Sequence, residues 1–239
     1  MLCREFSLVK HGDGWGIAIP LLCRSWGCDY CNPIRKRQLV DLAKSGQPNR
    51  LVTITVSPAV GVSAADRAQR LAAAWRRVVQ RWRRLNQTQE LEYLAVFEAT
   101  KRGEPHLHVL CRSGYIAQRW LSVQMRELLG SPIVDVRRIH SARHAALYVS
   151  KYVGKAPHHF ATCKRYWQSK AYATPVADKT NALDGIGTPW SIVEKPLREI
   201  MHDWEKRHLP VHPYRPYCTL EEHWRITDEI YYGQPPNHA

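Results

Sequence analysis

The chain has 239 residues, of which 44% are hydrophobic, so a packed core is expected and a wholly disordered chain is excluded. Lys and Arg number 35 against 21 Asp and Glu, and the net charge of +14 favours a polyanionic partner, either nucleic acid or an anionic membrane. No run approaches the ~20 apolar residues of a membrane helix, and the first residues lack the apolar stretch of a secretory signal. Nucleic acid is therefore the favoured partner, with no membrane association expected.

The N-terminal segment combines a predicted hairpin with a cysteine cluster. Residues 5–22 alternate on either side of Asp13, which predicts two strands that turn there. The chain has seven cysteines, an odd number that argues against a disulfide framework. Three of them lie within nine residues, a spacing that can hold one Zn²⁺: Cys23, Cys28 and Cys31. The alternative is a set of free thiols.

A closed structural zinc site requires a fourth ligand. If Asp13 is the centre of the hairpin turn, Cys3 lies opposite Cys23. Cys3 is therefore the predicted fourth ligand, and His11 is the alternative.

Beyond residue 46, segments that alternate with period two interchange with segments whose apolar residues recur at three and four. Predicted strands cover residues 50–56, 94–100, 106–112, 133–139 and 164–167. Predicted helices cover residues 63–85, 117–129, 141–153, 196–207 and 220–232. Short hairpins between helices indicate an antiparallel sheet with helices packed on it, which is the α+β class. The arginines of the first long helix are interpreted mainly as a solvated face.

Two histidines on one predicted strand form a candidate metal site. His106 and His108 are two residues apart, so strand alternation puts both imidazoles on one face. A three-residue turn over 102–104 would place Glu98 opposite His108 and offer a third ligand. Such a set can hold a divalent metal and leave positions open for substrate oxygens. The alternative is a pair of ordinary strand residues.

Two tyrosines share a face of the helix predicted over 141–153. Tyr148 and Tyr152 are four residues apart, and each is followed three residues later by a lysine, Lys151 or Lys155. A nearby cation favours the phenolate form of a phenol whose ordinary pKa is ~10, and a metal polarises a phosphodiester under attack. The product of that attack would be a 5′-phosphotyrosine and a free 3′-hydroxyl. The alternative places both tyrosines in a core stripe.

His106-Leu107-His108, followed about forty residues later by the Tyr-x-x-Lys-Tyr-x-x-Lys pattern, resembles the HUH endonuclease superfamily of rolling-circle replication initiators. The nearest resemblance is to the two-tyrosine initiators of microvirus-like single-stranded DNA phages and related plasmids. The hairpin from Glu98 to His108 resembles the metal-site hairpin of that family, and residues 51–55 and 164–170 resemble its flanking segments. The resemblance covers about residues 23–170.

The resemblance implies an RRM-like or ferredoxin-like sheet and a site-specific nicking and joining activity on single-stranded DNA. His106 and His108 would bind Mg²⁺ or Mn²⁺, with Glu98 as a third ligand. Tyr148 and Tyr152 would be nucleophiles assisted by Lys151 and Lys155, and two tyrosines would permit two successive transesterifications.

The resemblance also implies partners and an organisation of the chain. The partners would be an origin stem-loop, a host helicase and a host polymerase in the cytoplasm of a bacterium, near its nucleoid. The expected organisation is a zinc-binding segment over 1–45, an endonuclease domain over 46–193 and a helical extension over 194–239. The extension carries 6 basic and 8 acidic residues, net −2, so the preceding residues carry +16.

Other functions remain open. The same residues would serve a transposase or a mobilisation relaxase. A zinc-stabilised nucleic-acid-binding module without catalysis would keep the cysteines and treat the histidines and tyrosines as core. A histidine-triad phosphohydrolase is disfavoured because position 110 is Leu.

Overall fold

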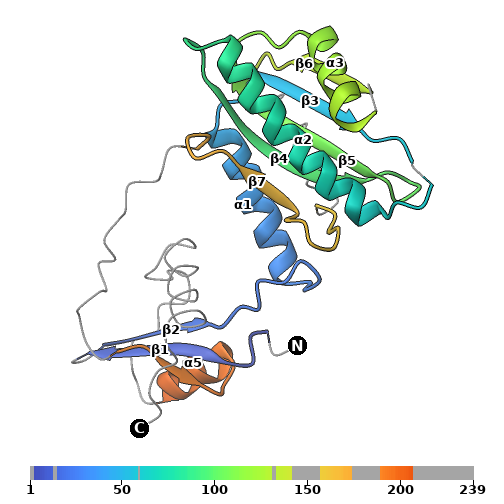
Figure 1. The fold of residues 1–239 in the computed structure, drawn as a ribbon. Helices are drawn as coiled ribbons and strands as arrows, with labels where there is room; N and C mark the ends of the chain where they lie inside the picture. The colour runs from blue at the N-terminus through green and yellow to red at the C-terminus, as the bar shows by residue number, and fades with distance from the viewer. Residues whose placement is uncertain are drawn as a thin grey trace. The chain divides into compact units, whose positions relative to one another are not determined.

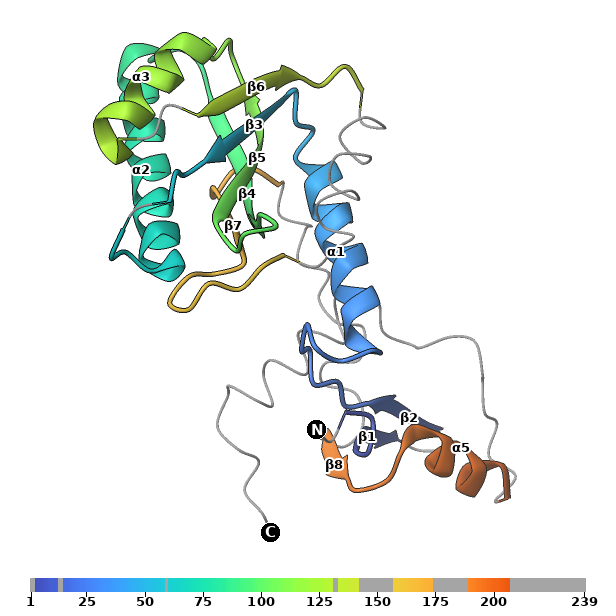
Figure 2. The same cartoon turned by 90° about the vertical axis from the view of Figure 1, so that its right-hand side faces the viewer.

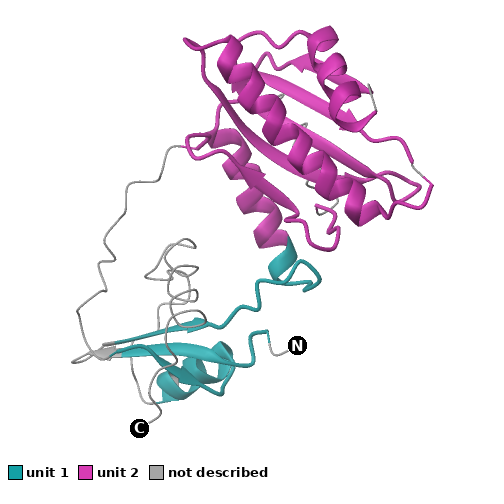
Figure 3. Ribbon diagram, viewed as in Figure 1, with its two compact units in different colours: residues 1–32, 176–239 teal, residues 33–175 magenta. Residues whose placement is uncertain are grey.

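The computed structural model describes residues 3–12, 15–58, 60–130, 133–141, 157–173 and 189–206. The chain divides into two compact units, residues 1–32 with 176–239 (unit 1) and residues 33–175 (unit 2) (Figure 3). Among the described residues, no helix is both long and apolar enough to cross a membrane. The helices predicted over 141–153 and 220–232 fall mainly outside the described residues.

Unit 2 contains a five-stranded antiparallel sheet with the strand order β6-β3-β5-β4-β7 (Figure 1). The strands are β3 (Arg50–Thr55), β4 (Leu91–Ala99), β5 (Pro105–Ser113), β6 (Val134–Arg138) and β7 (Tyr166–Gln168). These strands and the helices between them confirm the predicted α+β class, with β5 at the centre of the sheet.

Two helices, α2 (Ala64–Leu85) and α3 (Gln118–Leu129), cover one face of this sheet (Figure 2). The backbone N–H of Asp66 donates to Oγ of Ser63 at 3.0 Å, which caps the start of α2 as the sequence predicts. Gly130 ends α3 in the left-handed conformation with φ 66°. Both helix ends therefore have their unpaired backbone groups partly satisfied.

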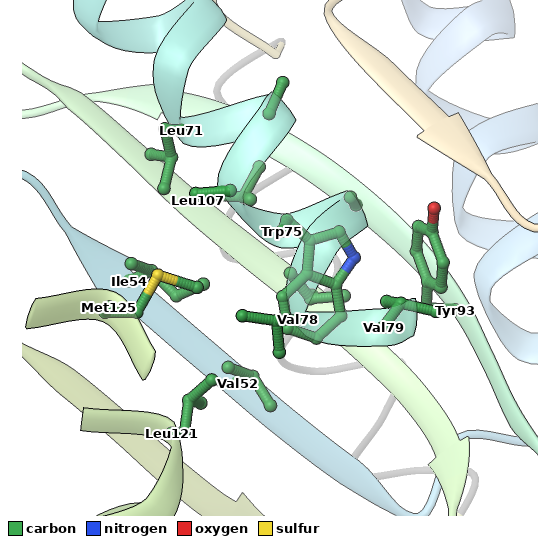
Figure 4. Packing of buried hydrophobic residues seen from close by; sticks show 14 of the residues in the cluster. Val52, Ile54, Leu71, Trp75, Val78, Val79, Tyr93, Leu107, Leu121 and Met125 are labelled. Atoms are coloured by element: carbon green, nitrogen blue, oxygen red, sulfur yellow. The ribbon is translucent and has the colours of Figure 1, made fainter. Parts of the chain in front are cut away.

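The hydrophobic core lies between these helices and the sheet (Figure 4). Trp75 of α2 is fully buried, and its ring meets that of Tyr93 edge-on with the centroids 5.5 Å apart. Alternate residues of β3 and β5 enter the same core, among them Ile54 and Leu107. Their strand neighbours therefore point to the other face of the sheet.

On that other face lies the part of α1 (Cys31–Ser45) that belongs to unit 2 (Figure 2). Tyr172 is fully buried there and donates a hydrogen bond from its hydroxyl to the carbonyl of Ala43 at 3.0 Å. Gly46 follows α1, and a Cβ at this position would overlap the ring of Tyr172. The contact requires a glycine because no side chain fits between the backbone and the ring.

Unit 1 contains a three-stranded sheet with the order β2-β1-β8. Its strands are β1 (Ser7–Gly12), β2 (Trp15–Pro20) and β8 (Ser191–Val193), and α5 (Leu197–Lys206) follows. Gly12 pairs with Trp15, so the hairpin turn has two residues and the predicted register about Asp13 is wrong by one. Leu8, Ile17, Ile19 and Leu21 form the core of this unit.

Candidate functional site

The two predicted metal-binding histidines lie on the sheet face opposite α2 and α3. His106 and His108 alternate on β5 with Leu107, which is buried in the core. Their cross-strand partners on β3 are Thr55 and Thr53, respectively. Nδ1 of His106 lies 2.9 Å from Oγ1 of Thr55, and Nδ1 of His108 lies 3.2 Å from Oγ1 of Thr53. The two imidazole centroids are 4.6 Å apart, so β3 and β5 together form a paired histidine face.

Glu98 joins this face, although the predicted strand register is wrong by two residues. Its partner is His106 rather than His108. The turn consists of residues 101–103, because Gly103 with φ 79° occupies its last position rather than its middle. A shift of two residues preserves the side on which a strand residue points. Glu98 therefore still reaches the histidines, and its Oε2 lies 3.0 Å from Nε2 of His108.

Burial sets the protonation of this face. The side chain of His108 is 5% exposed and that of Glu98 is 21% exposed. Burial lowers the pKa of His106, and the charge of Glu98 opposes this shift. A lowered pKa keeps the imidazole of His106 neutral near pH 7, which is the form that binds metal ions.

A buried ion pair holds the hairpin that carries these groups. Nε and Nη2 of Arg67 donate to the two carboxylate oxygens of Glu104 at 2.8 and 2.9 Å, and Nη1 donates to the carbonyl of Val62. The Arg67 side chain is 9% exposed, so its interpretation as part of a solvated helix face is wrong. Its position one helical turn before Leu71 of the buried stripe is the signal that could have indicated this.

The four predicted cysteine ligands come together in unit 1. The Sγ atoms of Cys3, Cys23, Cys28 and Cys31 all lie within 4.8 Å of one another. Sγ of Cys31 is 3.5 Å from that of Cys3 and 3.7 Å from that of Cys23. Tetrahedral zinc with Zn–S bonds of about 2.3 Å separates its sulfurs by about 3.8 Å, so the four-cysteine cluster is compatible with structural zinc.

Backbone N–H groups point at these sulfurs. The N–H of Cys23 donates to Sγ of Cys3, and the N–H of Ser25 donates to Sγ of Cys23, both at 3.5 Å. A backbone hydrogen bond from Cys31 is the main cause that lowers the pKa of Cys28 to about 7. Burial has the opposite effect on Cys3 and Cys31, whose pKa values are raised. N–H donors to sulfur stabilise the thiolate form that zinc requires.

The remaining predicted ligand and the tyrosine motif have less structural description. His11 lies on β1 opposite Gly16, and its side chain lies outside what the structure describes. Tyr148, Lys151, Tyr152 and Lys155 all lie outside the described residues. Among the residues that the structure describes, the cysteine cluster is the one group of three or more potential ligands close enough to hold a metal ion.

The fold and this face define an α+β protein with a paired histidine face on its central strand. Residues 49–157, just under half of the chain, match a family model of replication-associated proteins, the ORF2 type. No curated protein and no solved structure matches the chain. The family match supports a replication initiator protein with DNA as its partner, and it includes the histidine face but not the cysteine cluster.

Proposed function

We propose that the chain is a site-specific single-stranded DNA nickase and strand transferase that initiates rolling-circle replication. The observation that carries this proposal is the set of Glu98, His106 and His108 on one sheet face, within the segment that matches the replication-associated family. A buried carboxylate and two imidazoles whose Nδ1 atoms each meet a threonine hydroxyl have little purpose in a plain packing surface.

The donor set fits Mg²⁺ or Mn²⁺. His106 and His108 would hold the ion through Nε2, because Nδ1 of each ring is already in contact with a threonine. Glu98 would be the third ligand, since its carboxylate already reaches His108. A bound divalent ion supplies a Lewis acid that polarises a phosphodiester oxygen.

The nucleophiles in this proposal are Tyr148 and Tyr152, with Lys151 and Lys155 favouring the phenolate form. The phenol oxygen bonds to phosphorus while the bond from phosphorus to the 3′ oxygen breaks. The phenol proton ends on the departing 3′ oxygen, so the products are a 5′-phosphotyrosine and a 3′-hydroxyl. The second tyrosine repeats this step when the origin is regenerated, and the phosphotyrosine bond keeps the energy needed for rejoining.

The proposed partners follow from this reaction. A single-stranded origin, presented as a stem-loop, is the substrate. A host polymerase extends the 3′-hydroxyl and a host helicase separates the strands, which places the reaction in the cytoplasm of a bacterial cell. Transposition or plasmid mobilisation would use the same side chains, and the DNA to which the 5′-phosphotyrosine is passed would distinguish them.

The experiment is a denaturing gel of the full chain incubated with Mn²⁺ and a labelled pool of single-stranded stem-loop oligonucleotides with randomised loops. We expect a covalent protein–DNA band that is absent in the double variant Tyr148→Phe, Tyr152→Phe and in His108→Ala. Tyr115→Phe is the matched control, because Tyr115 is 74% exposed on unit 2 and should leave the band intact. A band that persists in the double variant, or binding without any band, would contradict the proposal; the latter would favour the non-catalytic module.

A further inference from the structure

An exposed arginine–tyrosine pair lies beside the cysteine cluster. The guanidinium carbon of Arg4 is 4.3 Å from the centroid of the Tyr30 ring. Arg4 is exposed and Tyr30 is 42% exposed. Arg4 directly follows Cys3, and Tyr30 lies between Cys28 and Cys31 in the chain. The cluster therefore positions both members of the pair, although neither takes part in the proposed nicking reaction.

The backbone holds this pair in place. Arg4 has a φ of 72°, in the left-handed region that non-glycine residues seldom adopt. Its N–H donates to the carbonyl of Leu21 at 2.9 Å, and the neighbouring N–H of Cys23 donates to Sγ of Cys3. Left-handed residues without a glycine persist only where the surroundings hold them. The Arg4 side chain thus starts from a fixed position next to the cluster.

We propose that Arg4 and Tyr30 form a base-stacking site for single-stranded DNA, separate from the histidine face. Guanidinium planes and aromatic rings are the surfaces on which unpaired bases stack, and the arginine charge also suits a phosphate. Within the described part of the chain, no carboxylate pairs with Arg4, so its charge is available to a polyanion. The inference rests on the partner of the proposed function but does not need its nicking chemistry.

A purely internal role for the pair predicts something different. If Arg4 and Tyr30 only closed the cysteine cluster, their removal would release zinc and leave the affinity for DNA unchanged in zinc-loaded protein. A stacking site predicts the reverse, namely full zinc content and weaker binding. The two roles are therefore separable by measuring zinc content and DNA affinity on the same variants.

The test uses zinc-loaded full chain carrying Tyr148→Phe and Tyr152→Phe, so that covalent chemistry cannot contribute. Fluorescence anisotropy measures its binding to a labelled 30-nucleotide oligothymidine and to an abasic strand of the same length. We expect Tyr30→Ala to weaken binding to oligothymidine by at least about fivefold, without any effect on the abasic strand. Tyr30→Trp should retain the affinity, and Tyr115→Ala, which removes an exposed tyrosine that also lies near an arginine, should not change it.

The arginine has its own signature. We expect Arg4→Ala to reduce the dependence of log affinity on log salt by about 0.7, the value for one phosphate contact on a single strand. A second measurement avoids any folding defect of the variants: ultraviolet crosslinking of the wild-type chain to a bromodeoxyuridine strand, followed by peptide mapping. A crosslink on the peptide that contains Tyr30 supports the site. Unchanged affinity in zinc-loaded Tyr30→Ala, an equal loss on the abasic strand, or crosslinks confined to other peptides would overturn it.

Failure of this inference and failure of the proposed function give different results. If the chain nicks DNA but Tyr30 does not contribute to binding, the covalent band remains and only the stacking site is refuted. If no covalent band forms but Tyr30→Ala weakens binding, the stacking site stands and the nickase proposal falls.

Discussion

Oε2 of Glu98 lies 3.0 Å from Nε2 of His108, although the strand partner of Glu98 is His106. This diagonal contact means that the carboxylate lies beside one histidine in register and touches the other. The ring of His108 is thereby held at both nitrogens, by Glu98 at Nε2 and by Thr53 at Nδ1. Such restraint at a buried ring reduces the reorganisation needed to bind a ligand.

The threonine behind His106 should tune metal affinity. Thr55→Val keeps the shape of the side chain but removes the hydroxyl that meets Nδ1 of His106. We expect the affinity for Mn²⁺ to fall by about 10-fold to 100-fold, as for other groups that orient a metal ligand. Titration calorimetry on the purified chain measures this, and Thr55→Ser, which keeps a hydroxyl, is the control. Equal affinities of Thr55→Val and the wild type would show that the hydroxyl has no such role.

The lowered pKa of His106 should make the metal-free protein less stable in acid. Glu98, His108 and Thr55 are the groups that face it, and burial is the main cause of the shift. Above about pH 6.5 the ring is neutral in the folded and the unfolded chain. As the pH falls below this value the unfolded chain takes up the proton first, so the free energy of unfolding decreases. Urea unfolding at pH 7.5 and 5.5 should show a smaller decrease for His106→Gln than for the wild type, and an equal decrease would contradict this assignment.

The Arg67–Glu104 pair should contribute far more stability than a surface pair. Glu104→Gln leaves the Arg67 charge without its carboxylate at a side chain that is 9% exposed, and we expect a loss of about 3 kcal/mol. Glu127→Gln removes the partner of Arg81, a pair whose side chains are 40% and 53% exposed, and should cost no more than about 1 kcal/mol. Urea unfolding of both variants provides the comparison. Similar losses in the two variants would mean that burial of the first pair is unimportant.

Zinc removal should affect unit 1 selectively. All four cysteine ligands belong to unit 1, so a chelator should speed amide hydrogen exchange in β1 and β2 and leave β3 to β5 protected. Cys28→Ser should lose the single zinc that we expect per chain. Cys163→Ser is the control, because Cys163 is a half-buried free thiol of unit 2 outside the cluster. Metal analysis that finds no zinc in the wild type, with normal exchange in β1 and β2, would refute the structural zinc site.

Much of unit 2 is predictable because its signals are local. The alternation in β3 and the capping serine of α2 are each contained in a few consecutive residues. β4 begins at Leu91, three residues before the predicted start, because its first seven residues are all buried and alternation disappears there. The hairpin register depends on which turn position Gly103 occupies, and composition alone does not specify that.

Other elements have no local signal. α1 is mostly polar and buries few apolar residues, among them Leu39 and Ala43, so it shows no apolar stripe. β8 has three residues and pairs with β1 more than 180 residues away, where only the folded chain reveals its partner. The threonine contacts of His106 and His108 likewise depend on the β3–β5 register, which the sequence alone does not specify.

The pairing of β8 with β1 has a consequence for synthesis of the chain. Residues 7–9 leave the ribosome early, but their partners at 191–193 follow only after the whole of unit 2. At about 5–20 residues per second the β1 edge therefore waits roughly ten to thirty seconds for its neighbour. An unpaired strand edge attracts other strands during such an interval. The cysteine cluster is made within the first 31 residues, so zinc capture can hold the β1–β2 hairpin together while translation continues.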